Sequence, residues 1–251
     1  MGALSGKVVW ITGGGTGIGQ AAALLLAKEG AKVALLGRRA AMLEETAEAV
    51  RKTGAEVRTV SVDVADRTQV AAVAKDLLAA WKRVDILVNN AGLNVPKRRL
   101  RDLDGADWDL VINTNLTGAF NMIQAVLPPM RDQKDGLIVN VSSMAGKAAS
   151  GLAGTSYTAS KHGMNGLSHS INAEEWVYGI RATAFCPGEV NTPIIDKRPV
   201  KLSPEEKSRM MQPEDLAEGI LFLTTLNPRT HIPEMLLMPT HKRAFKPGEL
   251  G

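Results

Sequence analysis

Short runs of apolar residues recur along the 251-residue chain, and longer amphipathic segments separate them. The runs are rich in β-branched residues and end at Gly, Asn, Ser or Pro, which is typical of buried strands. Strands without polar alternation need cover on both faces of their sheet, and intervening helices provide it. The expected strands are residues 7–12, 31–37, 56–64, 84–91, 136–143, 180–188 and 234–240.

Strands joined by helices form a parallel sheet, and right-handed crossovers wind it in both directions. The sequence therefore predicts an α/β fold, a doubly wound Rossmann-type domain with a seven-stranded parallel sheet. No linker, repeat or low-complexity segment divides the chain, so we expect a single domain over residues 1–251. The expected helical segments are GQAAALLLAKEG, AAMLEETAEAVRKTG, RTQVAAVAKDLLAAWKRV, DWDLVINTNLTGAFNMIQAVLPPMR and SYTASKHGMNGLSHSINAEEW.

The composition argues against several classes of function. No apolar run approaches the ~20 residues that a membrane-spanning helix needs, and the first residues carry no export signal. The net charge of +4 is scattered and only 4% of residues are aromatic, so we expect no nucleic-acid partner. A single cysteine, Cys186, excludes an internal disulfide and a Cys-rich metal site. We expect a cytoplasmic protein without a bound metal.

The stretch TGGGTGIGQAAALLL follows the first expected strand and opens the first expected helix. Glycines let a backbone turn tightly against a ligand, and the N–H groups of a helix start suit a pyrophosphate. The Gly-Lys-Ser/Thr of an ATP-binding Walker A loop is replaced by Gly-Gln-Ala, and the strict G-x-G-x-x-G spacing also fails. The spacing present is Thr12-Gly13-x-x-x-Gly17-x-Gly19, which favours a dinucleotide site. The alternative from this loop alone is a glycine turn that binds no ligand.

Positively charged residues follow the second expected strand. Dinucleotide-binding folds usually have a carboxylate there for the adenosine ribose, but this chain has Arg38 and Arg39. The nearest acid, Glu44, falls in the next helix. An arginine can pair with a 2′-phosphate, so we expect a preference for NADP(H), with Arg38 as the main contact and NAD(H) possible. The alternative, two solvated arginines, is less favourable because cations at a helix N-terminus oppose its dipole.

The stretch GTSYTASKHG places Tyr157 and Lys161 four residues apart, on one face of a helix. A free phenol has a pKa of ~10 and is a reluctant proton carrier at neutral pH. A nearby ammonium favours the phenolate, so we expect Lys161 to lower the pKa of Tyr157 toward the working range. Alone, the pattern is too short to be specific.

Taken in order, these motifs resemble the classical short-chain dehydrogenase/reductase family over about residues 5–225. The resemblance implies an oxidoreductase that transfers a hydride between a nicotinamide and a carbonyl or secondary alcohol. It also implies a homo-oligomer, either a tetramer or a dimer. The motifs are Thr12-Gly13-x-x-x-Gly17-x-Gly19, Asp63-Val64, Asn89-Asn90-Ala91-Gly92, Asn115 in NTNLTG, Ser142-Ser143 in VNVSSMAG, Tyr157-x-x-x-Lys161 and Pro187-Gly188 in CPGEVNTP.

The resemblance assigns a catalytic tetrad of Asn115, Ser143, Tyr157 and Lys161. Tyr157 would be the general acid/base and the Ser143 hydroxyl would hold the carbonyl oxygen. Lys161 would also hold the nicotinamide ribose, and Asn115 would position Lys161 through a water. Ser143 is preferred to Ser142 because it directly precedes Met-Ala-Gly. The expected cofactor-binding residues are Gly13, Thr16, Gly17, Ile18, Gly19, Arg38, Arg39, Asp63, Val64, Asn90, Ala91, Gly92, Tyr157, Lys161, Pro187, Gly188, Val190 and Thr192.

Residues 191–212 are where relatives build a short substrate lid. Apolar and basic residues mix there, which suits an acyl-carrier-linked or carboxylate-bearing carbonyl. The C-terminal HIPEMLLMPTHKRAFKPGELG departs from the Gly-rich end common in the family, so pocket walls and subunit contacts do not carry over there. The apolar lid residues are Ile194, Ile195, Met210 and Met211, and the basic ones are Lys197, Arg198 and Lys201.

The leading hypothesis is an NADPH-dependent carbonyl reductase acting on a small-molecule substrate. One alternative is a non-catalytic dinucleotide-binding regulator, which has no need for both Tyr157 and Lys161. Another is an NAD-preferring alcohol dehydrogenase of the same family. An epimerase or dehydratase of the longer related group is less consistent with the chain, because its C-terminal region leaves little room for a nucleotide-sugar domain.

Overall fold

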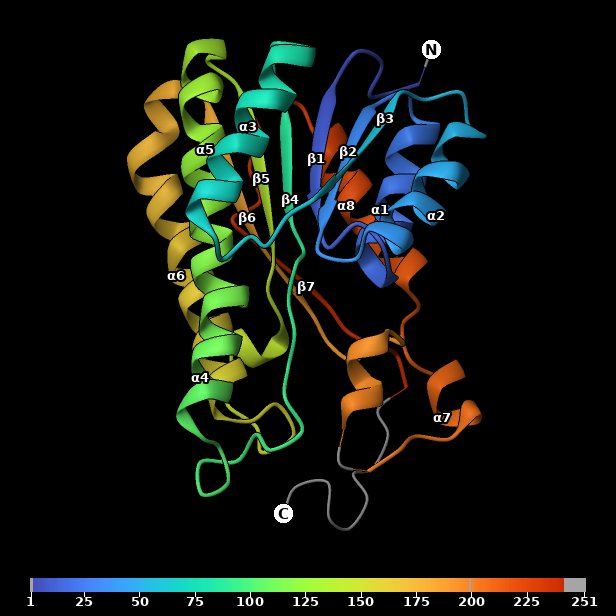
Figure 1. Cartoon of the computed structure of the whole chain (residues 1–251), viewed down its shortest axis with the longest axis vertical. Helices are drawn as coiled ribbons and strands as arrows, with labels where there is room; N and C mark the ends of the chain where they lie inside the picture. Colours follow the sequence, from blue (N-terminus) through green and yellow to red (C-terminus); the bar gives the residue numbers. More distant parts are fainter. Residues whose placement is uncertain (1, 199, 242–251) are drawn as a thin grey trace.

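The strands of this chain pair side by side in one direction, in the order β3-β2-β1-β4-β5-β6-β7 (Figure 1). The computed structural model describes residues 2–198 and 200–241. The predicted α/β doubly wound fold with a seven-stranded parallel sheet is confirmed. Residues 1, 199 and 242–251 of the expected 1–251 domain, including the last ten residues of its unusual C-terminal segment, lie outside the described residues. The strands are β1 Val8–Thr12, β2 Lys32–Gly37, β3 Val57–Ser61, β4 Ile86–Asn89, β5 Gly136–Val141, β6 Ile180–Pro187 and β7 Glu234–Leu237.

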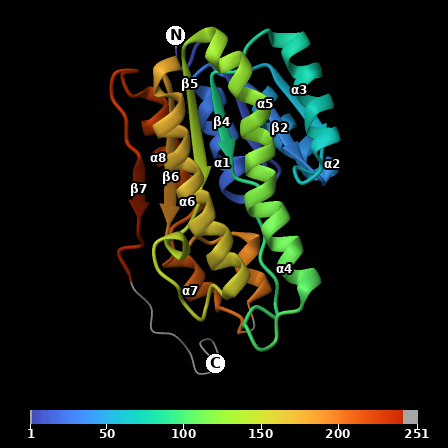
Figure 2. The ribbon, with the colours of Figure 1, turned by 90° about the vertical axis from the view of Figure 1, so that its left-hand side faces the viewer.

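Helices cover both faces of the sheet, as its continuous apolar strands require (Figures 1 and 2). Successive strand residues point to opposite faces, so Ile11 packs toward α1, α2 and α8 while Trp10 packs toward α3, α5 and α6. Both side chains are fully buried. The helices are α1 Gly17–Lys28, α2 Ala40–Arg51, α3 Arg67–Trp81, α4 Gly105–Ile112, α5 Gly118–Gln133, α6 Thr155–Glu175, α7 Pro204–Ser208 and α8 Pro213–Thr225.

The segment predicted as one long helix, residues 107–131, is interrupted. A π-helical stretch, η1 Asn113–Thr117, joins α4 to α5. A π-helical turn inserts a residue into the helical repeat and changes the direction in which its side chains point. Periodicity alone could not predict this, because the apolar spacing continues across the interruption.

Several strands are shorter than predicted at their carboxyl ends. β3 stops at Ser61 rather than at residue 64, and β4 stops at Asn89 rather than at residue 91. The residues beyond these ends leave the hydrogen-bonded ladder and turn along the carboxyl edge of the sheet. Strand order reverses between β1 and β4, and in such sheets this edge is where ligands bind.

The expected lid, residues 191–212, forms a compact excursion from the sheet. It contains the 3-10 helix η4 Pro193–Lys197 and the short helix α7. A parallel bridge between Val190 and Met211 brings its two ends together. Within the described residues, none of the helices combines the length and apolar character needed to cross a membrane.

Candidate active site

A cleft of about 780 Å³ opens at the carboxyl edge of the sheet. It is lined by the loop after β1, by the ends of β2 to β6, by α6 and by the first part of the lid. The structure brings the predicted site residues to this cleft, except that Gly19 and Asn115 lie behind its wall. Nor does the described part of the chain gather three His, Cys, Asp or Glu side chains that could hold a metal ion.

The glycine loop is held against the loop that follows β4. Asn90 Nδ2 donates to the carbonyl oxygens of Thr12 at 3.0 Å and Gly13 at 3.1 Å. The Thr12 hydroxyl oxygen accepts from the backbone N–H of Ala91 at 2.9 Å. A Cβ on Gly19 would lie 2.4 Å from Gly13 O and 2.6 Å from Asn90 Nδ2, so no larger residue fits there. Asn90 is therefore a brace for the loop as much as a wall of the cleft.

The N-terminus of α1 faces the cleft with its backbone N–H groups available. Its N-cap, Thr16, makes no side-chain capping bond, and its first turn contains no acid. A helix start of this kind favours an anion, because the N–H groups and the helix dipole both present positive charge. Across the cleft, Thr192 lies over the loop, since a Cβ on Gly17 would be 3.2 Å from its Cγ2. These features fit the pyrophosphate of a dinucleotide.

The adenosine end of the cleft is positively charged. Arg38 and Arg39 line it, and Arg39 Nη2 donates to Thr16 Oγ1 at 3.2 Å. Glu44 turns away: it is paired with Arg51 at 2.5 Å and is absent from the cleft wall. Asp63 lines the same end and accepts a 3.0 Å hydrogen bond from the N–H of Ala65.

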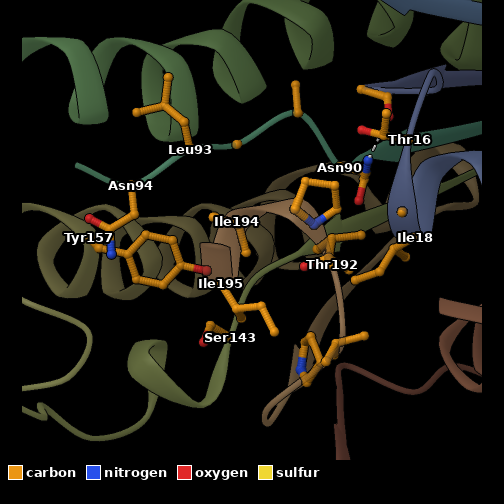
Figure 3. A pocket seen from close by; sticks show the side chains of 18 of the residues that line it. Thr16, Ile18, Asn90, Leu93, Asn94, Ser143, Tyr157, Thr192, Ile194 and Ile195 are labelled. Atoms are coloured by element: carbon orange, nitrogen blue, oxygen red, sulfur yellow. Dashed lines mark hydrogen bonds between the residues drawn. The ribbon is translucent and has the colours of Figure 1, made fainter. Parts of the chain in front are cut away.

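At the other end, Tyr157 projects from α6 toward Ser143 and the start of the lid (Figure 3). Ser143 caps η2 Met144–Gly146, where its Oγ accepts from Ala145 N at 3.1 Å. Ser142, by contrast, is 3% exposed and its hydroxyl donates to the backbone carbonyl of Lys161. The structure thus places Ser143, and not Ser142, beside the phenol.

The expectation that Lys161 lowers the pKa of Tyr157 is wrong in this structure. Removal of the phenol from bulk water raises that pKa, while Ser143 and the guanidinium groups of Arg198 and Arg98 oppose the rise. The Lys161 Nζ lies 5.6 Å from the centroid of the ring, over its face rather than at its hydroxyl.

Lys161 is itself buried, at 3% exposure, and its Nζ donates to Val141 O at 2.7 Å. Burial lowers its pKa from 10.5 to about 8. The ammonium is held next to the end of β5 and Tyr157, which a helical spacing of four residues allows. A lysine with such a pKa can exchange its proton close to neutral pH.

Asn115 lies in the π-helical stretch and is fully buried. Its Oδ1 accepts from Leu93 N at 2.8 Å, and its Nδ2 donates to Leu93 O at 3.0 Å and to Ser160 Oγ at 3.2 Å. It therefore fixes the loop after β4 and one turn of α6. A Cβ on Gly92 would lie 3.4 Å from Asn115 Oδ1 and 3.7 Å from Lys161 Nζ, so the two side chains flank the same glycine.

The sequence did not identify several residues that line the substrate end. Arg98 comes from the loop between β4 and α4, where no motif marks it. Near the C-terminus, Met238, Pro239 and His241 also line the cleft. Of the expected lid residues, Met210 and Met211 are buried instead and Lys201 lies away from the cleft wall. Those that line it are Ile194, Ile195, Lys197 and Arg198.

Comparison with known proteins agrees with this geometry. The family described as short chain dehydrogenase matches residues 7–202. The 3-oxoacyl-[acyl-carrier-protein] reductase FabG of Thermotoga maritima is 39% identical over 228 residues, covering 88% of this chain and 92% of that protein. A metagenomic short-chain oxidoreductase solved in complex with NADP superposes with a TM-score of 0.83, at 33% identity over 96% of this chain and 100% of that one. A short chain dehydrogenase from Mycobacterium paratuberculosis bound to NAD gives 0.82, at 27% identity over 94% and 97%.

The chain therefore belongs to the short chain dehydrogenase family, as its motifs predicted. It is an oxidoreductase with an NAD(P)-binding fold. The structural neighbours include one with NADP and one with NAD, and a nicotinamide dinucleotide is the cofactor class that they support.

Proposed function

We propose that this protein is an NADP(H)-dependent carbonyl reductase in which Tyr157 is the general acid. The observation that carries the proposal is the meeting of Tyr157, Ser143 and Lys161 in the same cleft as the free N-terminus of α1. A site for a dinucleotide and a proton donor thus share one cavity. A purely regulatory dinucleotide-binding protein would not need the proton donor.

When bound, the nicotinamide supplies a hydride to the carbonyl carbon. The glycine loop and the α1 N-terminus bind the pyrophosphate, while Lys161 holds the nicotinamide ribose. As negative charge grows on the carbonyl oxygen, the Ser143 hydroxyl donates a hydrogen bond to it. The Tyr157 O–H bond breaks and its proton forms the O–H bond of the alcohol product. The raised pKa of Tyr157 keeps it protonated at neutral pH, as an acid in carbonyl reduction must be.

The preference for NADP(H) rests on charge at the adenosine end. Arg38 and Arg39 follow β2 and line the cleft at the position where other dinucleotide-binding folds have a carboxylate. Such a carboxylate would repel a 2′-phosphate. The nearest acid of this chain, Glu44, is paired with Arg51 and does not line the cleft. Arginine forms charge-assisted hydrogen bonds with phosphate. An NAD-preferring alcohol dehydrogenase is the competing proposal, and relative affinity for the two cofactors separates them.

A substrate panel tests the function. Oxidation of NADPH and NADH, followed at 340 nm, is measured with ketones, aldehydes and β-ketoacyl thioesters. We expect turnover with NADPH, and Tyr157→Phe should reduce kcat by roughly 10³-fold or more, because general acid catalysis contributes about 10²–10⁴-fold. Cofactor affinity should change less than about threefold. Cofactor binding without turnover on any substrate would favour the regulator, and an unchanged rate in Tyr157→Phe would rule out the mechanism.

We also propose that the protein is a homo-oligomer, a dimer or tetramer. Large apolar side chains are exposed on α5 and α8, where Phe120 is 39% and Phe222 is 49% exposed. Light scattering of the purified full chain gives its mass directly, and a monomer at micromolar concentration would contradict this.

A further inference from the structure

The substrate end of the cleft contains a buried arginine with which no carboxylate in residues 2–198 or 200–241 pairs. Arg98 is 6% exposed and lines the cleft. Its Nε donates to Val95 O at 2.9 Å and its Nη1 donates to Leu152 O at 3.2 Å. Its Nη2 donates to Lys197 O at 2.9 Å. All three acceptors are neutral carbonyls, and within the described residues no acid forms an ion pair with it.

A second guanidinium lies nearby on the lid. The Arg198 side chain is 10% exposed, lines the cleft and pairs with Glu189 at 2.7 Å. Arg98 bonds the carbonyl of Lys197, the residue that directly precedes Arg198, so the two arginines are held near one another. Burial, and after it the positive charge of Arg198, lower the pKa of Arg98. Like charges held together away from water are costly unless an anion compensates them.

The balance of charge at this end is positive. Glu189 is the acid that lines it in the described part of the chain, since Asp63 stands at the adenosine end. Arg98, Lys161 and Arg198 all line the same end. The bound cofactor would place its phosphates at the far end of the cleft, beside the glycine loop and Arg38, and so would leave this excess uncompensated.

Apolar side chains form the remaining wall. Leu93, Leu152 and Met144 line the cleft, together with Ile194 and Ile195 of the lid. Figure 3 shows Ile194 and Ile195 in the same pocket as Tyr157. Such a wall suits an apolar substrate body, while the guanidinium groups suit a single anionic group attached to it.

We propose that the substrate is a carbonyl compound with a free carboxylate a few bonds from its carbonyl group, and that Arg198 binds this carboxylate next to Arg98 and Tyr157. This inference rests on the proposed reductase function. Guanidinium groups match carboxylates in a two-bond geometry. A neutral acyl thioester would bring no charge so close to its carbonyl, and Arg98 would keep no carboxylate partner among the described residues. Glu189 then holds Arg198 in place in the free protein and competes with the incoming carboxylate.

Equilibrium binding of unreactive probes tests the anion site separately from catalysis. The full chain, loaded with NADP⁺, is titrated calorimetrically with 4-phenylbutanoate and with the neutral 4-phenylbutanamide, which has the same shape. We expect the acid to bind at least tenfold more tightly than the amide. Equal affinities, or no measurable binding of the acid at millimolar concentration, would overturn the inference.

Two substitutions should act in opposite directions. Arg198→Gln removes the positive charge and should reduce the acid-over-amide preference to less than about threefold. Glu189→Gln removes the competing carboxylate and should increase it. Arg209→Gln makes the same charge change on the exposed surface of the lid, where Arg209 pairs with Glu205, and should leave the preference unchanged. If Arg209→Gln lowers the preference as much as Arg198→Gln does, general attraction to a basic protein explains it and the specific site is wrong.

Arg198→Lys keeps a positive charge and provides a second test of the site if the glutamine variant does not fold. It should retain part of the preference, and circular dichroism melting confirms that each variant is folded. A lysine variant that is folded but shows no preference for the acid over the amide would contradict an electrostatic role for this position.

Turnover distinguishes failure of this inference from failure of the proposed function. NADPH oxidation is compared for 4-oxo-4-phenylbutanoate and its methyl ester. A higher kcat/KM for the acid, with the acid-to-ester ratio reduced in Arg198→Gln, supports both proposals. Equal use of acid and ester supports the reductase but overturns the anion site. Selective binding of 4-phenylbutanoate without turnover of either ketone, or of the wider panel, overturns the reductase and leaves the anion site standing.

Discussion

The two ends of the cleft are built in different ways. The cofactor end consists of short turns directly after β1, β2 and β4, and contacts such as Asn90 Nδ2 to Gly13 O join neighbouring strand ends. The substrate end is assembled from loops far apart in the chain, joined by Arg98, which bonds Leu152 54 residues away and Lys197 99 residues away. The first arrangement depends on glycine positions that a motif records. The second depends on long loops whose meeting point no local pattern specifies.

The largest effect on this comparison should come from Gly19→Ala. Its Cβ would lie 2.4 Å from Gly13 O, and backbone cannot move aside as a flexible side chain can. We expect the glycine loop to be displaced, a loss of unfolding free energy of roughly 2–3 kcal/mol, and a cofactor affinity at least 30-fold weaker. Urea unfolding and cofactor titration by fluorescence measure the two effects.

Gly166→Ala is the matched control for that change. Gly166 lies in α6, and a Cβ there would meet nothing within 4 Å. Alanine in an exposed helix interior should stabilise the protein by up to about 1 kcal/mol without affecting cofactor binding. If Gly19→Ala behaves like this control, the cofactor end is not as tightly braced as its geometry indicates.

The next effect should follow from Arg38→Asp, which tests whether the cofactor end binds the 2′-phosphate and so distinguishes NADPH from NADH. NADPH affinity should fall by roughly 100-fold, because a charge-assisted bond is lost and a repulsive carboxylate takes its place. NADH affinity should change less than about threefold. Arg229→Asp makes the same charge change on an exposed residue before β7 and should weaken neither cofactor. Equal losses for NADPH and NADH in Arg38→Asp would remove the basis for the cofactor preference.

The third effect concerns the stability contributed by Lys161, which stands where the two ends meet. The folded protein holds its proton less tightly than the unfolded chain does, because burial lowers the pKa from 10.5 to about 8. The unfolded chain therefore binds more protons between about pH 8 and 10.5, and this residue opposes folding fully below pH 8 and progressively less above it. Lys161→Met should abolish turnover but raise the unfolding free energy at pH 7 by up to about 3 kcal/mol.

That gain should shrink as the pH rises from 8 to 10.5, since the wild-type lysine becomes neutral there in both states. Urea unfolding of both proteins at several pH values isolates Lys161, because all other titrating groups are shared. Two results would contradict the conclusion that the ammonium of Lys161 is buried at a cost in stability. One is a methionine variant that is less stable than the wild type at pH 7. The other is a difference in unfolding free energy that does not vary with pH.

Much of the fold could be predicted because a strand that is buried on both faces of its sheet appears in the sequence as a continuous run of apolar residues. All seven predicted strands exist, with β3 and β4 shortened where their ends turn into the cleft. The interruption at Asn115 could not be predicted, because a π-helical turn changes hydrogen-bonding partners without changing the apolar spacing. The pKa of Tyr157 was also predicted in the wrong direction, since the sequence shows its cationic neighbour but not how far the phenol is removed from water.

By itself, the sequence determined the parallel sheet, the glycine turn at its carboxyl edge and the pairing of a phenol with an ammonium on one helix. These follow from contacts between residues a few positions apart and from the exclusion of apolar strands from water. Only the tertiary structure decided that Arg98 and Arg198 face the same phenol, because they lie 100 positions apart in the printed numbering. Their proximity depends on how two long loops pack together, and that packing is fixed by the whole fold rather than by either loop alone.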